Sequence, residues 1–284
     1  MTFTVYILII LTLNSPVKRE TLEGKNTMTY KLIGVGTNAK TIKGDGSEYL
    51  TAITYLTPWK TLFEGKVYNL CAMAGAACCY KPCLNSAGRG QMTNVQTARL
   101  RKTHMWLKDR QAYLDLLRED LKIFQRRCER NNVQACYRPN GTSDIPWENY
   151  GIIDEFPDIQ FYDYTKIIKR VYKKLPKNYH LTLSYSEANS KYADDVMSAV
   201  CDTGTSMAVV FRDEENIPDY FERIYANGRG TYGFRTFSMD NDDLRFLDPQ
   251  GMAGALYAKG KAKYDTSGFV IDGDTASKYI NVAW

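Results

Sequence analysis

The chain reads His180-Leu-Thr-Leu-Ser-Tyr185 and then, after an interval long enough for a helix, Met207-Ala-Val-Val-Phe-Arg212. Further short apolar runs of this kind lie at 133–138, 159–163, 232–238 and 252–257. Strands that alternate with helices at this spacing predict βαβ units and a parallel sheet. The intervals 164–175 and 190–201 are the clearest places for helices. Six such units without a doubly wound fingerprint favour an α/β fold that is (β/α)-barrel-like, complete or partial.

The N-terminal half of the chain shows mainly helical periodicity. Residues 92–130 are helical in character and predict two helices or one bent helix. One apolar face recurs within them at spacings of three and four residues: Leu114, Leu117, Leu121, Phe124 and Cys128. Cys128 is therefore expected in the core. Upstream, 51–56 predicts a short strand and 37–49 a polar, turn-rich loop.

Polar side chains follow nearly every predicted strand. In a barrel the residues just past the carboxyl ends of the strands line the active face, so these side chains predict a polar binding cup. The residues expected to hold a cofactor or substrate there are Asn140, Ser143, Asp144, Ser184 and Glu187. The residues expected to hold anionic groups are Lys166, Arg212 and Arg245.

Composition limits the class of protein. The chain has 284 residues, a net charge of +5 and seven cysteines, which are odd in number and clustered. This argues against a secreted disulfide scaffold and for a reducing compartment, so we expect a cytoplasmic location in a host cell, away from membranes. The apolar run 5–13 is too short to span a bilayer and lacks a basic flank and a cleavage site. We therefore interpret 1–27 as a dispensable leader or a mis-assigned start, and 28–284 as one domain.

Four of the seven cysteines fall within Cys71-Ala-Met-Ala-Gly-Ala-Ala-Cys78-Cys79-Tyr-Lys-Pro-Cys83. Structural zinc sites usually need two ligand pairs of the C-x2–4-C type, and this segment offers only one such pair, ending at Cys83, with no second pair elsewhere in the chain. The C-x-x-C spacing of redox disulfides is absent. Three thiolates can hold a [4Fe–4S] cluster whose fourth iron stays open to a small ligand. Cys71, Cys79 and Cys83 give C-x7-C-x3-C, and Cys78 in place of Cys79 gives C-x6-C-x4-C. The alternative is that these cysteines are simply small side chains in a loop.

Two basic features are candidate anion sites. Gly88-Arg89-Gly90 precedes the helix expected from Met92, and backbone N–H groups at such a start, with Arg89 beside them, suit an anion. The second feature is a run of cations without an intervening acid: Lys166, Lys169, Arg170, Lys173, Lys174 and Lys177. This run predicts either a solvated helix face or a patch that binds nucleic acid by releasing counterions.

The chain resembles a family of uncharacterised proteins carried by bacteriophages and prophages. The resemblance covers most of residues 30–274 and rests on Cys71…Cys79…Cys83-Leu-Asn-Ser-Ala-Gly-Arg-Gly, Asn-Gly-Thr-Ser-Asp, Phe-Tyr-Asp-Tyr-Thr-Lys, Asp-Leu-Arg-Phe-Leu-Asp-Pro and Ala-Lys-Gly-Lys-Ala. More remotely, three cysteines ahead of βα units resemble the radical-SAM superfamily, whose usual spacing is C-x3-C-x2-C. This resemblance implies a [4Fe–4S] cluster and S-adenosylmethionine (SAM) as cofactors.

Two functions are therefore expected from the sequence. The first is a radical-SAM-like enzyme of phage origin, in which Cys71, Cys79 and Cys83 ligate iron and the substrate is a nucleotide or a nucleic acid. The second is a nucleic-acid-binding accessory protein of phage replication, with a structural metal or none. A steep salt dependence of nucleic-acid binding would favour the second function, and reductive consumption of SAM would favour the first.

Overall fold

The computed structural model describes residues 30–36, 46, 48–215, 217–225, 228 and 230–272. The predicted leader 1–27 and most of the predicted loop 37–49 lie outside these residues. No helix within the described ranges combines the length and the apolar character needed to cross a bilayer.

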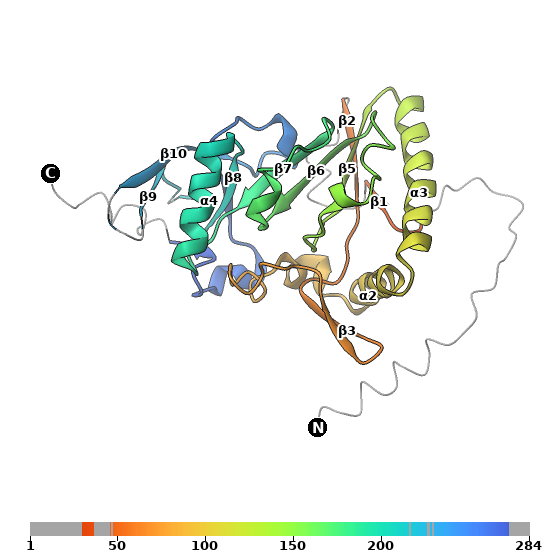
Figure 1. The fold of residues 1–284 in the computed structure, drawn as a ribbon, viewed down its shortest axis with the longest axis horizontal. Helices are drawn as coiled ribbons and strands as arrows, with labels where there is room; N and C mark the ends of the chain where they lie inside the picture. Colours follow the sequence, from red (N-terminus) through yellow and green to blue (C-terminus); the bar gives the residue numbers. More distant parts are fainter. Residues whose placement is uncertain are drawn as a thin grey trace, which may run out of the picture.

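A mostly parallel sheet forms the body of the molecule (Figure 1). Six parallel strands lie side by side in chain order: β2 (Tyr49–Ile53), β5 (Gln134–Arg138), β6 (Gln160–Thr165), β7 (Tyr179–Ser184), β8 (Met207–Phe211) and β11 (Ala253–Tyr257). The α/β class and the parallel sheet are thus confirmed, and each predicted strand in this set is present with its ends shifted by a few residues.

The prediction of a complete barrel is wrong. In the described part of the chain the sheet has ten strands and is open, with β1 (Gly34–Val35) at one end and β9 (Tyr220–Ile224) at the other. Both end strands pair antiparallel with their neighbours, β1 with β2 and β9 with β10 (Thr231–Ser238). The β9–β10 hairpin extends the sheet outward beyond β11, so the parallel strands do not close on themselves.

Two strands pair in succession with the same side of β8. β7 pairs with β8 only through Leu183 and Ser184. Beyond them β12 (Val270–Ile271) pairs with the end of β8 instead. This insertion brings the chain around residue 269 to the carboxyl edge of the sheet.

Three α-helices in the described residues are α2 (Thr93–Lys108), α3 (Arg110–Arg130) and α4 (Ser190–Thr203). They confirm the helices predicted at 92–130 and 190–201. Asp109 and Asn189 cap α3 and α4, each accepting from a backbone N–H of the first turn at 2.9 Å. The predicted apolar face of α3 is buried, and Cys128 is 1% exposed, as expected. The prediction of a helix at 164–175 is wrong, because only the 3-10 turn η5 (Ile168–Arg170) forms there.

The two faces of the sheet differ. Alternate residues such as Tyr137, Phe161 and Leu181 pack with α3 in one core cluster, and Leu183 on the same face packs with α4 in the next. The opposite face carries Cys136 and Tyr162, which pack on the segment that leads into η6 (Arg245–Leu247). Helices therefore cover one face, and a returning loop covers part of the other.

The cysteine-rich segment follows β2 after a separate hairpin, β3 (Lys60–Phe63) and β4 (Lys66–Asn69). It then passes through the 3-10 turns η2 (Leu84–Ser86) and η3 (Gly88–Gln91) into α2. The segment is loop and turn throughout and is not part of the sheet.

Candidate functional site

A cavity of about 190 Å³ lies at the carboxyl ends of the parallel strands. The sheet contributes the last or second-to-last residue of five strands: Arg138, Tyr164, Ser184, Val210 and Leu256. The cysteine-rich segment contributes the opposing wall, with Cys71, Ala74, Cys79, Pro82 and Cys83. Because these ends meet at one edge of a parallel sheet, residues far apart in the chain share one site.

Three of the four clustered cysteines line this cavity. Cys71, Cys79 and Cys83 belong to its wall, whereas Cys78 does not. Cys78 has a φ of 51° and its thiol donates to the carbonyl of Gly75 at 3.5 Å. Of the two spacings that the sequence left open, the C-x7-C-x3-C set is therefore the one that faces a common space.

Two of the half-buried thiols that line the cavity, those of Cys71 and Cys83, have raised pKa values. Cys71 Sγ accepts from the backbone N–H of Trp59 at 3.3 Å and donates to the carbonyl of Thr142 at 3.6 Å. Burial raises the pKa of Cys71 to about 12. Burial also raises the pKa of Cys83, against the smaller opposing effects of Lys166 and Arg99.

The cysteines are not arranged as a metal-binding group as they stand. Within the described ranges no three His, Cys, Asp or Glu side chains come together closely enough to hold a metal ion. Thiolates are the species that bind metal, so a metal would have to displace the thiol protons.

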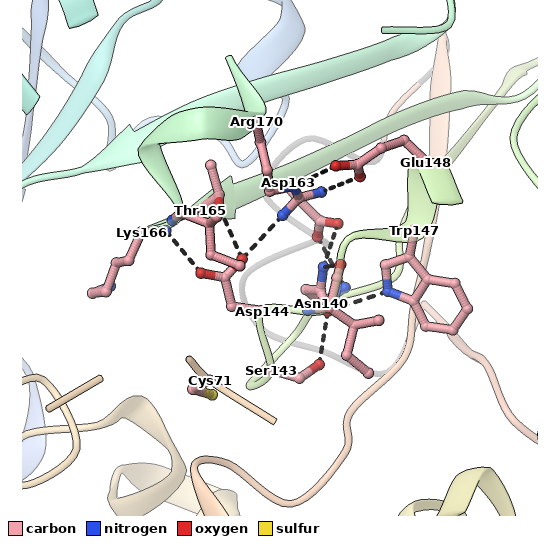
Figure 2. Close-up of polar contacts among 12 residues, drawn as sticks. Cys71, Asn140, Ser143, Asp144, Trp147, Glu148, Asp163, Thr165, Lys166 and Arg170 are labelled. Atoms are coloured by element: carbon pink, nitrogen blue, oxygen red, sulfur yellow. Dashed lines mark hydrogen bonds and ion pairs between the residues drawn. The ribbon is translucent and has the colours of Figure 1, made fainter. Parts of the chain in front are cut away.

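The loop after β5 is built around Asn140 (Figure 2). Its side-chain oxygen accepts from Ser143 Oγ at 2.8 Å, from the N–H of Ile145 at 3.0 Å and from Trp147 Nε1 at 3.2 Å. Its amide donates to Asp163 Oδ2 at 2.8 Å. The bonds of Asn140 are directed into the protein, so this residue shapes the cavity wall rather than presenting its amide to a ligand.

Asp144 is likewise engaged within the protein (Figure 2). It accepts from Thr165 Oγ1 at 2.9 Å, from the backbone N–H of Lys166 at 2.8 Å and from Arg170 Nη1 at 3.0 Å. Arg170 also donates to both oxygens of Glu148, at 3.0 and 2.8 Å. This buried network ties the end of β5 to the end of β6.

The structure brings eight of the predicted site residues to one cavity. They are Cys71, Cys79, Cys83, Asn140, Ser143, Asp144, Lys166 and Ser184. Lys166 Nζ donates to Ser184 Oγ at 2.8 Å and lies 5.2 Å from the centre of the Phe269 ring.

Four predicted site residues are not part of the cavity wall. Arg89 is exposed in η3. Glu187 accepts from Tyr185 Oη at 3.2 Å and lies 3.9 Å from Arg223. For these two residues the sequence shows only a polar side chain beside a turn or a strand end, which is also what an ordinary loop contains.

The other two are structural arginines. Arg212 pairs with Asp272 and donates to the carbonyl of Asp265 at 2.7 Å, which fastens the segment that leads to β12. Arg245 is 1% exposed and pairs with Asp242 at 3.1 Å and with Asp248 at 3.4 Å. Burial raises the pKa of Asp248 to about 6.

The basic run does not form one face. Arg170 is 1% exposed and lies in the network with Asp144 and Glu148. Lys166 lines the cavity. The exposed members are Lys169, Lys173, Lys174 and Lys177. A helical cation face is therefore absent from the described chain here, and the remaining lysines lie on an irregular segment.

Several cavity residues were not among the predicted set. Arg138 and Tyr164 belong to the last two residues of β5 and β6, and the guanidinium of Arg138 lies 4.6 Å from the centre of the Tyr164 ring. Lys259 and Phe269 come from beyond β11. The alternation of β5 and β6 would have placed the first two on one face, but no local pattern marks Phe269, which depends on the pairing of β12 with β8.

Comparison with known proteins identifies one family. The family model described as gene product 88 matches residues 29–273. No curated protein and no solved structure matches the chain significantly. The match supports the resemblance to phage-type proteins, and nothing in the comparisons supports the resemblance to radical-SAM enzymes. The chain belongs to the gene product 88 family.

Proposed function

We propose that this protein is an iron–sulfur enzyme of the radical-SAM type, in which Cys71, Cys79 and Cys83 hold a [4Fe–4S] cluster. One observation carries the proposal: these three thiols line a single cavity at the carboxyl edge of a parallel sheet, and Cys78 does not. Thiolate sulfur is the donor that iron–sulfur clusters use, and three thiolates leave one iron open to another ligand.

The order of the strands supports the proposal. Six parallel strands follow one another in chain order, and α3 and α4 pack on the same face of the sheet. Sequential parallel strands with helices on one face also occur in (β/α) barrels, although the sheet of this protein is open. The cysteine-rich segment comes after the first of these strands, so it reaches the carboxyl edge where ligands bind in such sheets.

Two cations near Cys83 favour its thiolate, whereas Asp144 raises the pKa of Cys71. Lys166 and Arg99 both lower the pKa of Cys83, and thereby oppose the effect of its burial. A metal ion adds positive charge and removes the thiol proton outright. Because the three sulfurs are not gathered in the described structure, binding requires the 71–83 segment to close around the metal.

The other residues have positioning and binding roles in this proposal. Asn140 and Asp144 hold the wall loop in place through their internal hydrogen bonds. Ser143, Ser184 and Lys166 present polar groups that could contact SAM or a substrate. The chemistry that a reduced cluster supplies is one electron for the cleavage of SAM. The substrate we propose is a nucleotide or a nucleic acid.

The test compares two adjacent cysteines. The full chain is purified without oxygen and reconstituted with iron and sulfide, and its iron content, sulfide content and visible spectrum are measured. We expect Cys79→Ala to lose most of the bound iron and Cys78→Ala to retain it, because only Cys79 lines the cavity. Equal iron content in the two variants, or a reconstituted wild-type protein that binds no iron, would contradict the proposal.

A second measurement separates the enzyme from the alternative function. The loaded protein is incubated with SAM and a reductant, and 5′-deoxyadenosine is followed by chromatography. The alternative, a nucleic-acid-binding accessory protein, is favoured by the exposure of Lys169, Lys173 and Lys174. It predicts no SAM cleavage and a binding constant for nucleic acid that falls steeply with salt.

A further inference from the structure

Lys166 carries an uncompensated charge at the cavity. Its ammonium group donates to Ser184 Oγ at 2.8 Å and lies over the ring of Phe269. None of the ion pairs among the described residues includes Lys166. A cation without an acidic partner in a partly buried wall favours an anion beside it.

The other charged residues of the wall are already paired. Arg138 lies 2.9 Å from Asp243, and Lys259 lies 2.6 Å from Asp240. The one lining carboxylate, Asp144, is 3.0 Å from Arg170. Among the wall residues in the described ranges, Lys166 is therefore the charged group that is left for a ligand.

Ser184 adds a second donor at the same point. Its hydroxyl oxygen accepts the bond from Lys166, so its own hydrogen stays available to donate. Ser184 is 6% exposed and lines the cavity. An ammonium and a hydroxyl that converge in this way suit the oxygens of a phosphate or a carboxylate, because charge-assisted hydrogen bonds are the stronger kind.

The rest of the wall indicates what the anionic group is attached to. The rings of Tyr164, Tyr257 and Phe269 line the cavity together with Val210 and Leu256. Sites for drug-sized ligands usually enclose roughly 300–1,000 Å³. The cavity of about 190 Å³ thus suits a small ligand, or the anionic end of a larger one with a planar apolar part.

We infer that the cavity binds a ligand with an oxyanion group, a phosphate or a carboxylate, which is held by Lys166 and Ser184. This inference deepens the proposed function by naming the chemical class of a ligand, and it rests on the proposed cavity but not on the cluster. A phosphate would come from a nucleotide-like substrate, and a carboxylate would come from SAM.

The test is made on cluster-free full-length protein by calorimetric titration at constant ionic strength. The probes are adenosine 5′-monophosphate, adenosine and SAM, and the variants are Lys166→Gln and, as a matched control, Lys169→Gln. Lys169 belongs to the same basic run but is exposed and outside the cavity wall. Thermal unfolding of both variants confirms that they are folded.

For a phosphate ligand we expect the monophosphate to bind at least about tenfold more tightly than adenosine, and Lys166→Gln to remove this preference. For a carboxylate ligand we expect Lys166→Gln to weaken SAM about tenfold. Lys169→Gln should change neither. If Lys166→Gln alters no probe, or if both variants alter them equally, the inference is overturned. Iron content after reconstitution, measured separately, reports on the cluster proposal and is expected to be unchanged in Lys166→Gln.

Discussion

The wall of the cavity is tightly packed around Gly141. It follows Asn140 at the end of β5, and its N–H donates to the carbonyl of Thr54 at 2.9 Å. A methyl group on Gly141 would lie 2.6 Å from the ring of Tyr55 and 2.8 Å from the Thr54 oxygen. A side chain at position 141 would therefore prevent the close approach between the loop after β5 and the end of β2.

We expect Gly141→Ala to lower the free energy of unfolding by roughly 1–3 kcal/mol, the usual cost of forcing a methyl group into a filled space. Urea unfolding at neutral pH measures the change. Gly75→Ala is the matched control, because nothing lies within 4 Å of a methyl group built there. A loss of stability in the control as large as that in Gly141→Ala would show that the close approach is not the cause.

At the scale of elements, η5 joins β6 to the buried network below the cavity. Arg170, at the end of η5, contacts Asp144 after β5 and Glu148 in η4 (Trp147–Asn149). It also donates to Tyr179 Oη at 2.6 Å. The 3-10 turn η5 thus connects three segments although no helix forms there, because the buried Arg170 contacts the loop after β5, η4 and the start of β7.

We expect Arg170→Met to destabilise the protein by about 3–5 kcal/mol, because removing the cation leaves two buried carboxylates without their partner. The matched change, Lys173→Met, lies in the same basic run on an exposed residue and is expected to stay within about 0.5 kcal/mol. Chemical unfolding measures both variants. Equal effects would contradict the assignment of Arg170 to the network.

At the scale of the whole molecule, Asp163 makes folding sensitive to pH. It is fully buried on β6, and burial raises its pKa from 3.8 to about 7. The folded state then binds a proton that the unfolded state has already lost. The stabilisation is fully present below pH 3.8 and is lost as the pH rises to about 7.

The free energy of unfolding should therefore fall between about pH 4 and 7, by at most about 1.4 kcal/mol per pH unit from this group. Urea unfolding at several pH values measures the slope. Asp163→Asn should flatten it, because the amide has no proton to bind in this range. An unchanged slope in the variant would mean that other groups, such as Asp248, cause the pH dependence.

The sequence by itself determined the features that depend on neighbouring residues. The positions of β5 to β8, the apolar face of α3 and the burial of Cys128 all follow from local periodicity. The grouping of Cys71, Cys79 and Cys83 follows from their closeness in the chain. Asn140, Ser143 and Asp144 reach the cavity because loops after parallel strands share one edge.

Only the tertiary structure decided how distant segments pair. That β11 lies beside β8, with the β9–β10 hairpin outside it, opens the sheet where the sequence suggested closure. The pairing of β12 with β8 brings Phe269 to Lys166, and only the folded chain shows that Cys79 lines the cavity whereas Cys78 does not. Such pairings depend on packing between residues far apart in the chain, and a short local pattern carries no information about them.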